Sequence, residues 1–184
     1  MNRVAQFFRA VAALLRGLRG DEIQWVKAHL SPWEEALFWQ MSRIDQVHAV
    51  RVSMKAAQIA REEGIRDEAS VRALVRAGLL HDIGKVNGDI GLFDRVAVVL
   101  LKRFAPRLAD ALAVRGRQEL VHGTRRGIGT GLRRALYAHA VHAERGAAMA
   151  KLLGVEEAVV ELIRCHHRPQ GGGRLLEAFV KADR

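Results

Sequence analysis

Hydrophobic residues recur at spacings of three and four along most of this chain, which is the pattern of amphipathic α-helices. The first such segment covers residues 4–18 and carries arginines around the rest of its surface. Few prolines, only 5% aromatic residues and much alanine, leucine, arginine and glutamate also favour helix over sheet. The chain is therefore predicted to be all-α, with further helices beginning at Ser31 and covering 45–63, 71–82, 92–112 with a break before Pro106, 136–153, 155–167 and a last segment from about residue 174.

Local start and stop signals mark several of these helix ends. Residues 31–34, Ser-Pro-Trp-Glu, combine a capping box with proline at the first helical position, so a helix is expected to start there. Gly64 is expected to end the helix over 45–63 as a C-cap. Asp67 and Ser70 are candidate N-caps of the helix that follows.

A glycine- and arginine-rich segment separates the helical patterns in the second half of the chain. Residues 123–134 have the sequence GTRRGIGTGLRR, which predicts a flexible basic loop. We expect this loop to fold over an anionic substrate, and a disordered surface loop is the alternative. The candidate substrate ligands in it are Arg125, Arg126, Arg133 and Arg134.

The length and the cysteine count bound the domain organisation. At 184 residues the chain has the size of one domain, which we expect over residues 31–184, with a helical extension over 1–30 and the basic loop near 122–134. Because Cys165 is the only cysteine, no internal disulfide can form, and a reducing, cytoplasmic compartment is expected. No apolar run approaches the roughly 20 residues that span a bilayer, so no transmembrane helix is expected.

The formal charge of +10 predicts attraction to polyanions, unless it serves only solubility. The expected partner is an anionic small molecule that contains phosphate, in particular a nucleotide, whereas nucleic acid is not favoured. Residues 4–18 are expected to cover the core, and peripheral contact with a membrane surface is their alternative role. The sequence does not predict an oligomeric state.

Histidines are the residues that point to chemistry. Seven of the eight lie from residue 48 onward, and His81 is followed directly by Asp82 near the end of a predicted helix. Imidazole and carboxylate at adjacent helical positions can share one metal ion, and the two oxygens of an aspartate can bridge two. The dipeptide alone is weak, because chance produces it in about one chain in three of this composition.

The context of this dipeptide resembles the HD superfamily of metal-dependent phosphohydrolases. Residues 78–85 have the sequence GLLHDIGK, similar to the HDIG type of that superfamily, and the other histidine motifs follow in the family's order. The resemblance extends from about residue 45 to the C-terminus and implies a single-domain, all-α HD-type helical bundle. The residues that carry it are His48, His81, Asp82, His142 in HAERGAAMA, the pair His166 and His167, and Asp183 in VKAD.

The resemblance implies a binuclear metal site. Iron, manganese, nickel and zinc all suit such ligands, and a single metal ion is the alternative. One ion would be held by His48, His81, Asp82 and Asp183, and the second by Asp82, His142, His166 and His167. His139 competes with His142 as a ligand, and one of the paired histidines could contact substrate instead.

The implied activity is hydrolysis of a phosphate ester by a metal-activated hydroxide. Asp82 and Lys85 are the candidate catalytic residues; the Lys85 ammonium would bind a substrate phosphate if the helical turn persists, and a helix C-terminal cation is its alternative role. The GYP element of the HD-GYP phosphodiesterases is missing after His167, and position 44 is isoleucine where many of them have glutamate, so cyclic di-GMP is not favoured.

Other substrates remain open. The HDIG spelling with paired histidines resembles domains that cleave cyclic di-AMP, and compact members of the superfamily also include hydrolases of dinucleoside polyphosphates and nucleoside monophosphates. We therefore expect a phosphohydrolase or phosphodiesterase that acts on a nucleotide or cyclic dinucleotide. The alternative is a catalytically silent, metal-containing module that binds a nucleotide or RNA.

Overall fold

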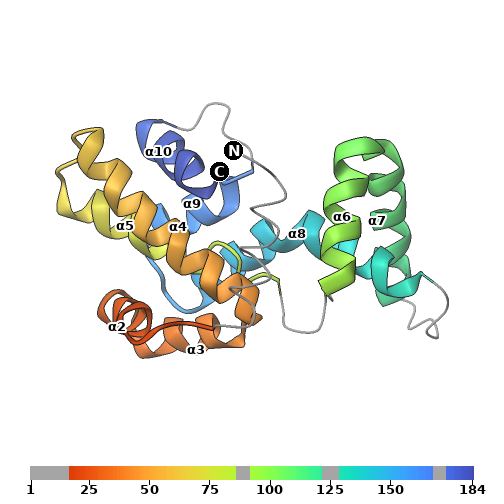
Figure 1. The fold of residues 1–184 in the computed structure, drawn as a ribbon, viewed down its shortest axis with the longest axis horizontal. Coiled ribbons are helices and arrows are strands. Elements are labelled where there is room, and N and C mark those ends of the chain that lie inside the picture. The colour runs from red at the N-terminus through yellow and green to blue at the C-terminus, as the bar shows by residue number, and fades with distance from the viewer. Residues whose placement is uncertain (1–16, 86–91, 122–128, 168–172) are drawn as a thin grey trace. The chain divides into compact units, whose positions relative to one another are not determined.

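The structure of this protein is a computed structural model, and it describes residues 17–85, 92–121, 129–167 and 173–184 (Figure 1). Within these ranges every regular element is an α-helix, so the predicted all-α fold class is confirmed. None of the described helices is both long and apolar enough to cross a membrane. The helices are α2 (Gly20–His29), α3 (Pro32–Gln40), α4 (Arg43–Glu62), α5 (Glu68–Leu80), α6 (Leu92–Phe104), α7 (Pro106–Val121), α8 (Thr130–Leu152), α9 (Glu157–Cys165) and α10 (Arg174–Asp183).

The predicted caps are found at the ends of α3, α4 and α5. The backbone N–H of Ser31 donates to the Glu34 carboxylate at 2.8 Å, and the Ser31 hydroxyl accepts from the Glu34 backbone at 3.5 Å. Helix α4 ends just before Gly64, whose φ of 68° lies in the left-handed region that glycine adopts without strain. The side chain of Asp67 accepts from the Ser70 backbone N–H at 2.8 Å. Capping residues therefore fix these helix ends as predicted.

The start of α8 differs from the prediction. This helix begins at Thr130, so Arg133 and Arg134 lie on a helix and not in the predicted basic loop. The physical reason is an ion pair: Arg133 Nε lies 2.5 Å from Oε1 of Glu119 on α7, and helical geometry directs the arginine to that partner. Arg125 and Arg126 lie outside the described residues.

Three further predictions concern the first helix, the break before Pro106 and the turn at Lys85. Residues 4–16 of the predicted first helix lie outside the described residues, and residues 17–18 are not helical. The predicted break before Pro106 is confirmed, because α6 ends at Phe104 and α7 begins at Pro106. The helix that leads to His81 ends at Leu80 and is followed by a turn, so the helical turn that would align Lys85 with Asp82 does not persist.

The chain forms two compact units, and the predicted boundary at residue 30 stays a prediction. The first unit consists of Met1–Ile83 and Ala143–Arg184, and the second of Gly84–His142. The core of the first unit is built from α2, α3, α4, α5, α9 and α10, with the C-terminal part of α8. Val26 of α2 is fully buried in this core, so α2 packs with the same hydrophobic residues as the later helices.

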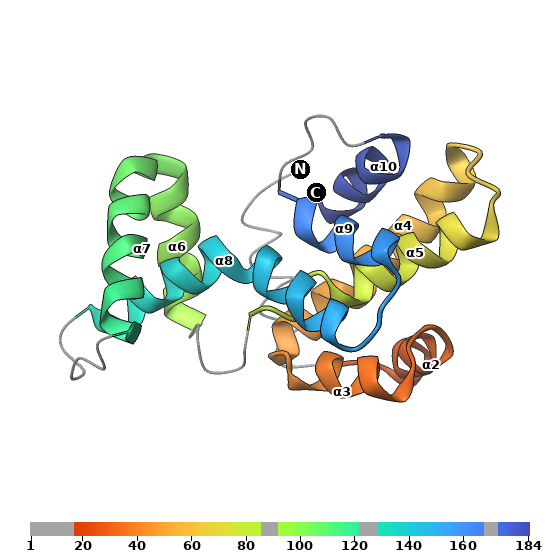
Figure 2. The ribbon, with the colours of Figure 1, turned by 180° about the vertical axis from the view of Figure 1, so that it is seen from behind.

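Helices α4 and α5 pack side by side in the centre of the first unit (Figures 1 and 2). Gly78 of α5 faces Ser53 of α4, and a Cβ atom at Gly78 would lie 2.5 Å from the Ser53 Cα. Trp25 of α2 covers the same contact, since its indole N–H donates to the Ser53 hydroxyl at 2.9 Å. The absence of a side chain at Gly78 therefore sets how closely the two helices approach.

Helix α10 is held along α4 by two polar contacts. The ammonium of Lys55 donates to the backbone carbonyl of Lys181 at 2.8 Å, and the Lys181 ammonium pairs with the Glu63 carboxylate at 2.6 Å. Phe179 on the opposite face of α10 is fully buried. Because Asp183 is the last residue of α10, this packing brings its carboxylate to α4.

An arginine joins three helices of the first unit. Arg76 of α5 donates twice to Oε1 of Glu34 on α3, at 2.8 and 3.2 Å, and lies 3.0 Å from the carboxylate of Glu156, the N-cap of α9. Glu34 is only 2% exposed, so its charge depends on this partner. Arg76 therefore fixes α5 and α9 relative to each other.

Replacing Arg76 with alanine is expected to lower the free energy of unfolding by about 3 kcal/mol, because it leaves a buried carboxylate without its cation. Urea unfolding measures this. Arg72→Ala is the matched control on the same helix, since Arg72 forms an exposed pair with Glu68 at 3.6 Å, its one ion pair within the described residues, and should matter by less than about 1 kcal/mol. Equal effects of the two substitutions would contradict the role given to Arg76.

The second unit has a small core of its own. Val98 of α6, Ala109 and Ala113 of α7, and Ala135 and Leu136 of α8 are buried together. Gly116 of α7 lies against the backbone carbonyl of Arg133, so that a Cβ there would collide with α8. Small residues thus allow the helices of this unit to approach closely.

Candidate metal centre

Three helices of the first unit bring two histidines and an aspartate to one point. His48 lies on α4, His81 follows the last residue of α5, and Asp183 ends α10. Nε2 of His48 lies 3.1 Å from Oδ1 of Asp183, and Nε2 of His81 lies 3.5 Å from the same oxygen. These three residues form a group that could hold a metal ion.

Asp82 adds a second carboxylate beside this group. Its Oδ2 lies 3.5 Å from Nε2 of His81, and both residues are 1% exposed. Adjacent ligands of one ion, at bond lengths of about 2.0–2.2 Å, lie roughly 3–3.5 Å apart. The distances from the Asp183 oxygen to the two imidazoles, 3.1 and 3.5 Å, match that spacing, and so does the 3.5 Å between Asp82 and His81. Two imidazoles with two carboxylates are also a donor set that divalent transition metals prefer, so the residues fit such an ion.

Backbone carbonyls fix the orientation of three of the histidine rings. Nδ1 of His81 lies 3.0 Å from the Gly78 carbonyl, and Nδ1 of His166 lies 2.6 Å from the Ile163 carbonyl. Because a carbonyl can only accept, Nδ1 carries the proton in each case, which leaves the Nε2 lone pair for a metal. His142 makes the same contact to the carbonyl three residues earlier, at 2.7 Å.

The ionisation of this site suits cation binding. Burial alone would raise the pKa of Asp183, but the hydrogen bond with His48 and the charge of His81 hold that pKa well below its usual range. Burial, and then the proximity of His81, lower the pKa of His166 to about 4. At neutral pH the site therefore presents an ionised carboxylate and a neutral imidazole, which are the protonation states that metal ligands need.

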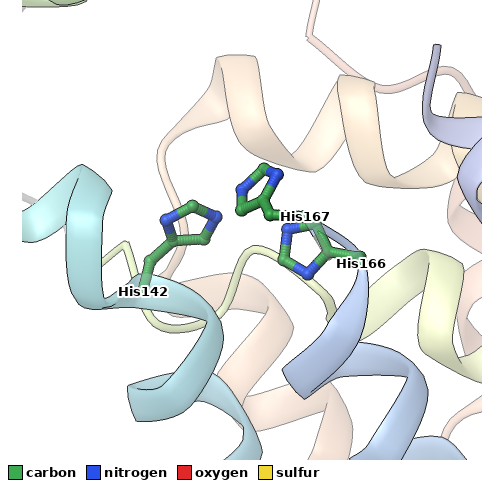
Figure 3. Close-up of side chains that lie close together, drawn as sticks. All are labelled: His142, His166 and His167. Carbon is green, nitrogen blue, oxygen red and sulfur yellow. The ribbon is translucent and has the colours of Figure 1, made fainter. Parts of the chain in front are cut away.

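The paired histidines belong to a second group. His166 and His167 form the turn after α9, with ring centroids 3.9 Å apart, and candidate ligand atoms of His142, His166 and His167 all lie within 4.8 Å of one another (Figure 3). His142 is fully buried and lies on α8, which continues from it directly into the first unit. The group contains His142 and not His139, whose contribution is the carbonyl that orients His142.

The two groups meet at His81 and His166. The centroids of these two rings lie 5.2 Å apart, and the buried Phe179 packs against both at 6.0 and 6.5 Å. The centroid of the His48 ring also lies 5.2 Å from that of His81. The predicted ligands His48, His81, Asp82, His166 and Asp183 therefore lie together in the first unit. His81, Asp82 and His166 are buried, and His48 and Asp183 are partly exposed.

The metal-free protein is expected to lose stability as the pH falls from about 6.5 toward 4. His166 has a folded pKa of about 4, below the ordinary value of 6.5, so the unfolded chain binds a proton in this range and the folded one does not. The stability is fully present above pH 6.5, and up to about 3 kcal/mol is lost as the pH falls to 4. Urea unfolding in chelator at several pH values measures the loss. His166→Gln should flatten this part of the profile; an unchanged slope would contradict the assignment.

For the other predicted site residues the structure gives only their burial and local contacts. Lys85 is half-buried and lies in the turn region that follows Asp82. Arg133 is paired with Glu119, as described above, and Arg134 is half-buried on the next position of α8. The role of these residues in substrate binding stays a prediction.

Some residues that shape the site were not predicted from the sequence. The carbonyls of Gly78 and Ile163 orient two ligands, Phe179 packs against both rings, and Gly78 also sets the distance between α4 and α5. Only Gly78 left a sequence signal, because an isolated glycine inside a helical pattern often marks a close contact.

Comparison with known proteins agrees with this site. A family model described as HD domain matches residues 46–133. No match is found among curated proteins or among solved structures. The matched range contains His48, His81 and Asp82. The remaining candidate ligands, His142, His166, His167 and Asp183, all follow it in the sequence. The resemblance to the HD superfamily that the HD dipeptide and the order of the histidines predicted is therefore confirmed over residues 46–133.

Proposed function

We propose that this protein is a metal-dependent phosphohydrolase that hydrolyses a phosphate ester of a nucleotide or cyclic dinucleotide. The observation that carries the proposal is the convergence of His48, His81 and Asp183, in which the two imidazoles lie 3.1 and 3.5 Å from one Asp183 oxygen. Asp82 adds a carboxylate 3.5 Å from His81. The HD domain supports it, because the superfamily consists largely of such hydrolases. The +10 charge of the chain favours an anionic substrate.

The residues of the site would prepare it for two divalent ions. His48, His81, Asp82 and Asp183 would hold one, and Asp82 with His142, His166 and His167 the other. A bound divalent metal supplies Lewis acidity and a nucleophile at neutral pH. The protein contributes ring orientation through the Gly78, His139 and Ile163 carbonyls, and a buried environment that strengthens the attraction between charges.

Cationic side chains outside the set of metal ligands would bind the substrate. Lys85 follows the HD dipeptide by three residues and is the first candidate for contact with a phosphate. Arg125 and Arg126 remain candidates from the sequence. Arg133 is the weaker one, because the Glu119 carboxylate already neutralises much of its charge.

The purified protein is expected to contain divalent metal and to hydrolyse at least one member of a panel of cyclic dinucleotides, dinucleoside polyphosphates and nucleoside monophosphates when Mn²⁺ or Fe²⁺ is added. Asp82→Ala should lower kcat/KM on the order of 10³-fold or more, because the metals supply several kcal/mol of transition-state stabilisation. Metal analysis and phosphate release measure the two quantities.

Asp110→Ala is the matched control, since Asp110 is an exposed aspartate of α7 in the second unit and should leave activity unchanged. Wild-type protein that binds metal and turns over nothing in the panel would favour the alternative, a silent module that binds a nucleotide or RNA. Activity that survives in Asp82→Ala would contradict the proposed site.

A further inference from the structure

The turn between α6 and α7 exposes apolar and basic side chains together. Residues 102–108 have the sequence KRFAPRL and form one end of the α6–α7 hairpin (Figures 1 and 2). Phe104 is 76% exposed and Leu108 is 52% exposed. We call the set of Lys102, Arg103, Phe104, Arg107 and Leu108 the hairpin tip.

The exposed apolar residues of the tip are not a displaced part of the core. Helix α6 already buries Val98 against Ala109 of α7, so the inner face of the hairpin is filled. Leu100 lies one turn before Phe104 and is 50% exposed, which places both on the outer face of α6. Large apolar side chains exposed together on one face often mark a surface that binds another molecule or a membrane.

The cations of the tip surround these apolar side chains. Lys102, Arg103 and Arg107 are all exposed, and none of them takes part in an ion pair within the described part of the chain. The guanidinium of Arg103 lies 5.8 Å from the centre of the Phe104 ring, so charge and apolar surface are adjacent. Asp110 is the only acidic residue between 95 and 118, one turn along α7. The tip is therefore cationic as well as apolar.

We propose that the hairpin tip binds an anionic lipid membrane surface. Phe104 and Leu108 would enter the boundary between headgroups and acyl chains, while Lys102, Arg103 and Arg107 would pair with lipid phosphates. A second copy of the chain is a poor occupant, because three cations would face three cations. Nucleic acid would use the charge and leave Phe104 and Leu108 without an apolar partner. Only a lipid surface satisfies both kinds of side chain.

Vesicle sedimentation tests the proposal with the full chain. Wild-type protein should bind vesicles of phosphatidylglycerol and phosphatidylcholine in mixture and bind pure phosphatidylcholine weakly. The pair Phe104→Ser and Leu108→Ser should weaken binding to the anionic vesicles by about tenfold or more, and so should Lys102→Gln, Arg103→Gln and Arg107→Gln together. Added salt should weaken wild-type binding and affect the triple variant less.

Leu152→Ser is the matched control, because Leu152 is 86% exposed at the end of α8, beside Lys151, and lies outside the tip. If the wild-type protein did not bind anionic vesicles, the proposal would be wrong. Tip variants that bind as wild type does would overturn it too and would assign membrane binding elsewhere, for example to residues 4–18. Loss of RNA binding with unchanged vesicle binding in the tip variants would favour nucleic acid instead.

A Phe104→Trp variant reports insertion directly. The fluorescence emission of the added tryptophan is obtained as the difference between variant and wild type. On anionic vesicles this emission should shift to shorter wavelength, and brominated acyl chains should quench it. Emission that stays at its value in water while the protein sediments with vesicles would show that the tip does not insert, and would overturn the proposal. Because none of these measurements uses hydrolysis, their outcome is independent of the proposed enzymatic function.

Discussion

Gly78→Ala is expected to destabilise the protein by about 3 kcal/mol and to weaken metal binding in the same variant. A Cβ at Gly78 would lie 2.5 Å from Cα and 2.7 Å from N of Ser53, which are backbone atoms that cannot rotate away. Alanine is the better helix former by about 1 kcal/mol, so the collision must outweigh a gain in helix propensity. Overpacking of this kind costs on the order of 1–3 kcal/mol and is greatest where only backbone can move.

The effect on metal binding follows from the positions of the ligands. His48 lies on α4, and His81 follows α5, so separating the two helices at Gly78 moves the two ligands apart. The Gly78 carbonyl also accepts from Nδ1 of His81, and a shift of α5 disturbs that contact. A displacement of a few tenths of an ångström is enough to matter, because the ligand atoms now fit one ion.

Urea unfolding in chelator measures the stability of this variant, and metal titration of the folded protein measures affinity. Gly20→Ala is the matched control, because Gly20 begins α2 and a Cβ there would meet nothing within 4 Å. The control should be as stable as wild type or slightly more stable. If Gly78→Ala were as stable as Gly20→Ala and bound metal normally, the proposed role of the α4–α5 contact would be wrong.

Helix ends were predictable where a side chain or a glycine determines them locally. Ser31 and Asp67 accept backbone hydrogen bonds within three residues, and Gly64 adopts a left-handed φ, so these ends follow from short stretches of sequence. The start of α8 was not predictable in this way. Glu119 of α7 stabilises the first turn of α8 through its ion pair with Arg133. The glycines of residues 123–134 predicted a loop, and they give no information about a partner fourteen residues away.

Which residues come together at the candidate site was predictable, and much of the geometry was not. The candidate ligands were predicted from the order of the histidine motifs, since His48 and Asp183 are 135 residues apart and no periodicity relates them. Their distances depend on helix packing at Gly78 and on the contacts of α10 with α4. Packing of this kind depends on the tertiary structure, which a local pattern does not contain.

Two of the three ring orientations have a simple origin in helix ends, whereas His142 makes its contact inside α8. His81 is the C-cap of α5 and His166 is the C-cap of α9, both in the right-handed helical region. The last carbonyls of a helix have no partner within it, and each ring places Nδ1–H on one of them. A histidine that directly follows a helix is thus held with Nε2 pointing away from the helix. Two helix ends that meet in one core can therefore each contribute an oriented imidazole to a metal site, which other residues complete.

Metal stoichiometry is expected to separate the two groups of ligands. Wild-type protein should bind two divalent ions per chain. His48→Gln should lose the ion between His48, His81 and Asp183 and keep the other, whereas His167→Gln should show the reverse, because each variant removes a ligand from one group only. Each affected ion should bind at least about a hundredfold more weakly. Mass spectrometry under native conditions and metal analysis after dialysis measure the number of ions retained.

Asp82 decides whether the two ions are coupled. If its carboxylate bridges them, Asp82→Ala should weaken both ions, unlike either histidine variant, because its Oδ2 lies 3.5 Å from His81 and its charge also acts on His166. His29→Gln is the control, since His29 contacts the carbonyl and ring of Trp25 and, among the described residues, belongs to neither group. A wild-type protein with one ion, lost equally in all three site variants, would replace the binuclear site with a single one. Loss of one ion only in Asp82→Ala would instead assign this carboxylate to one metal and exclude the bridge.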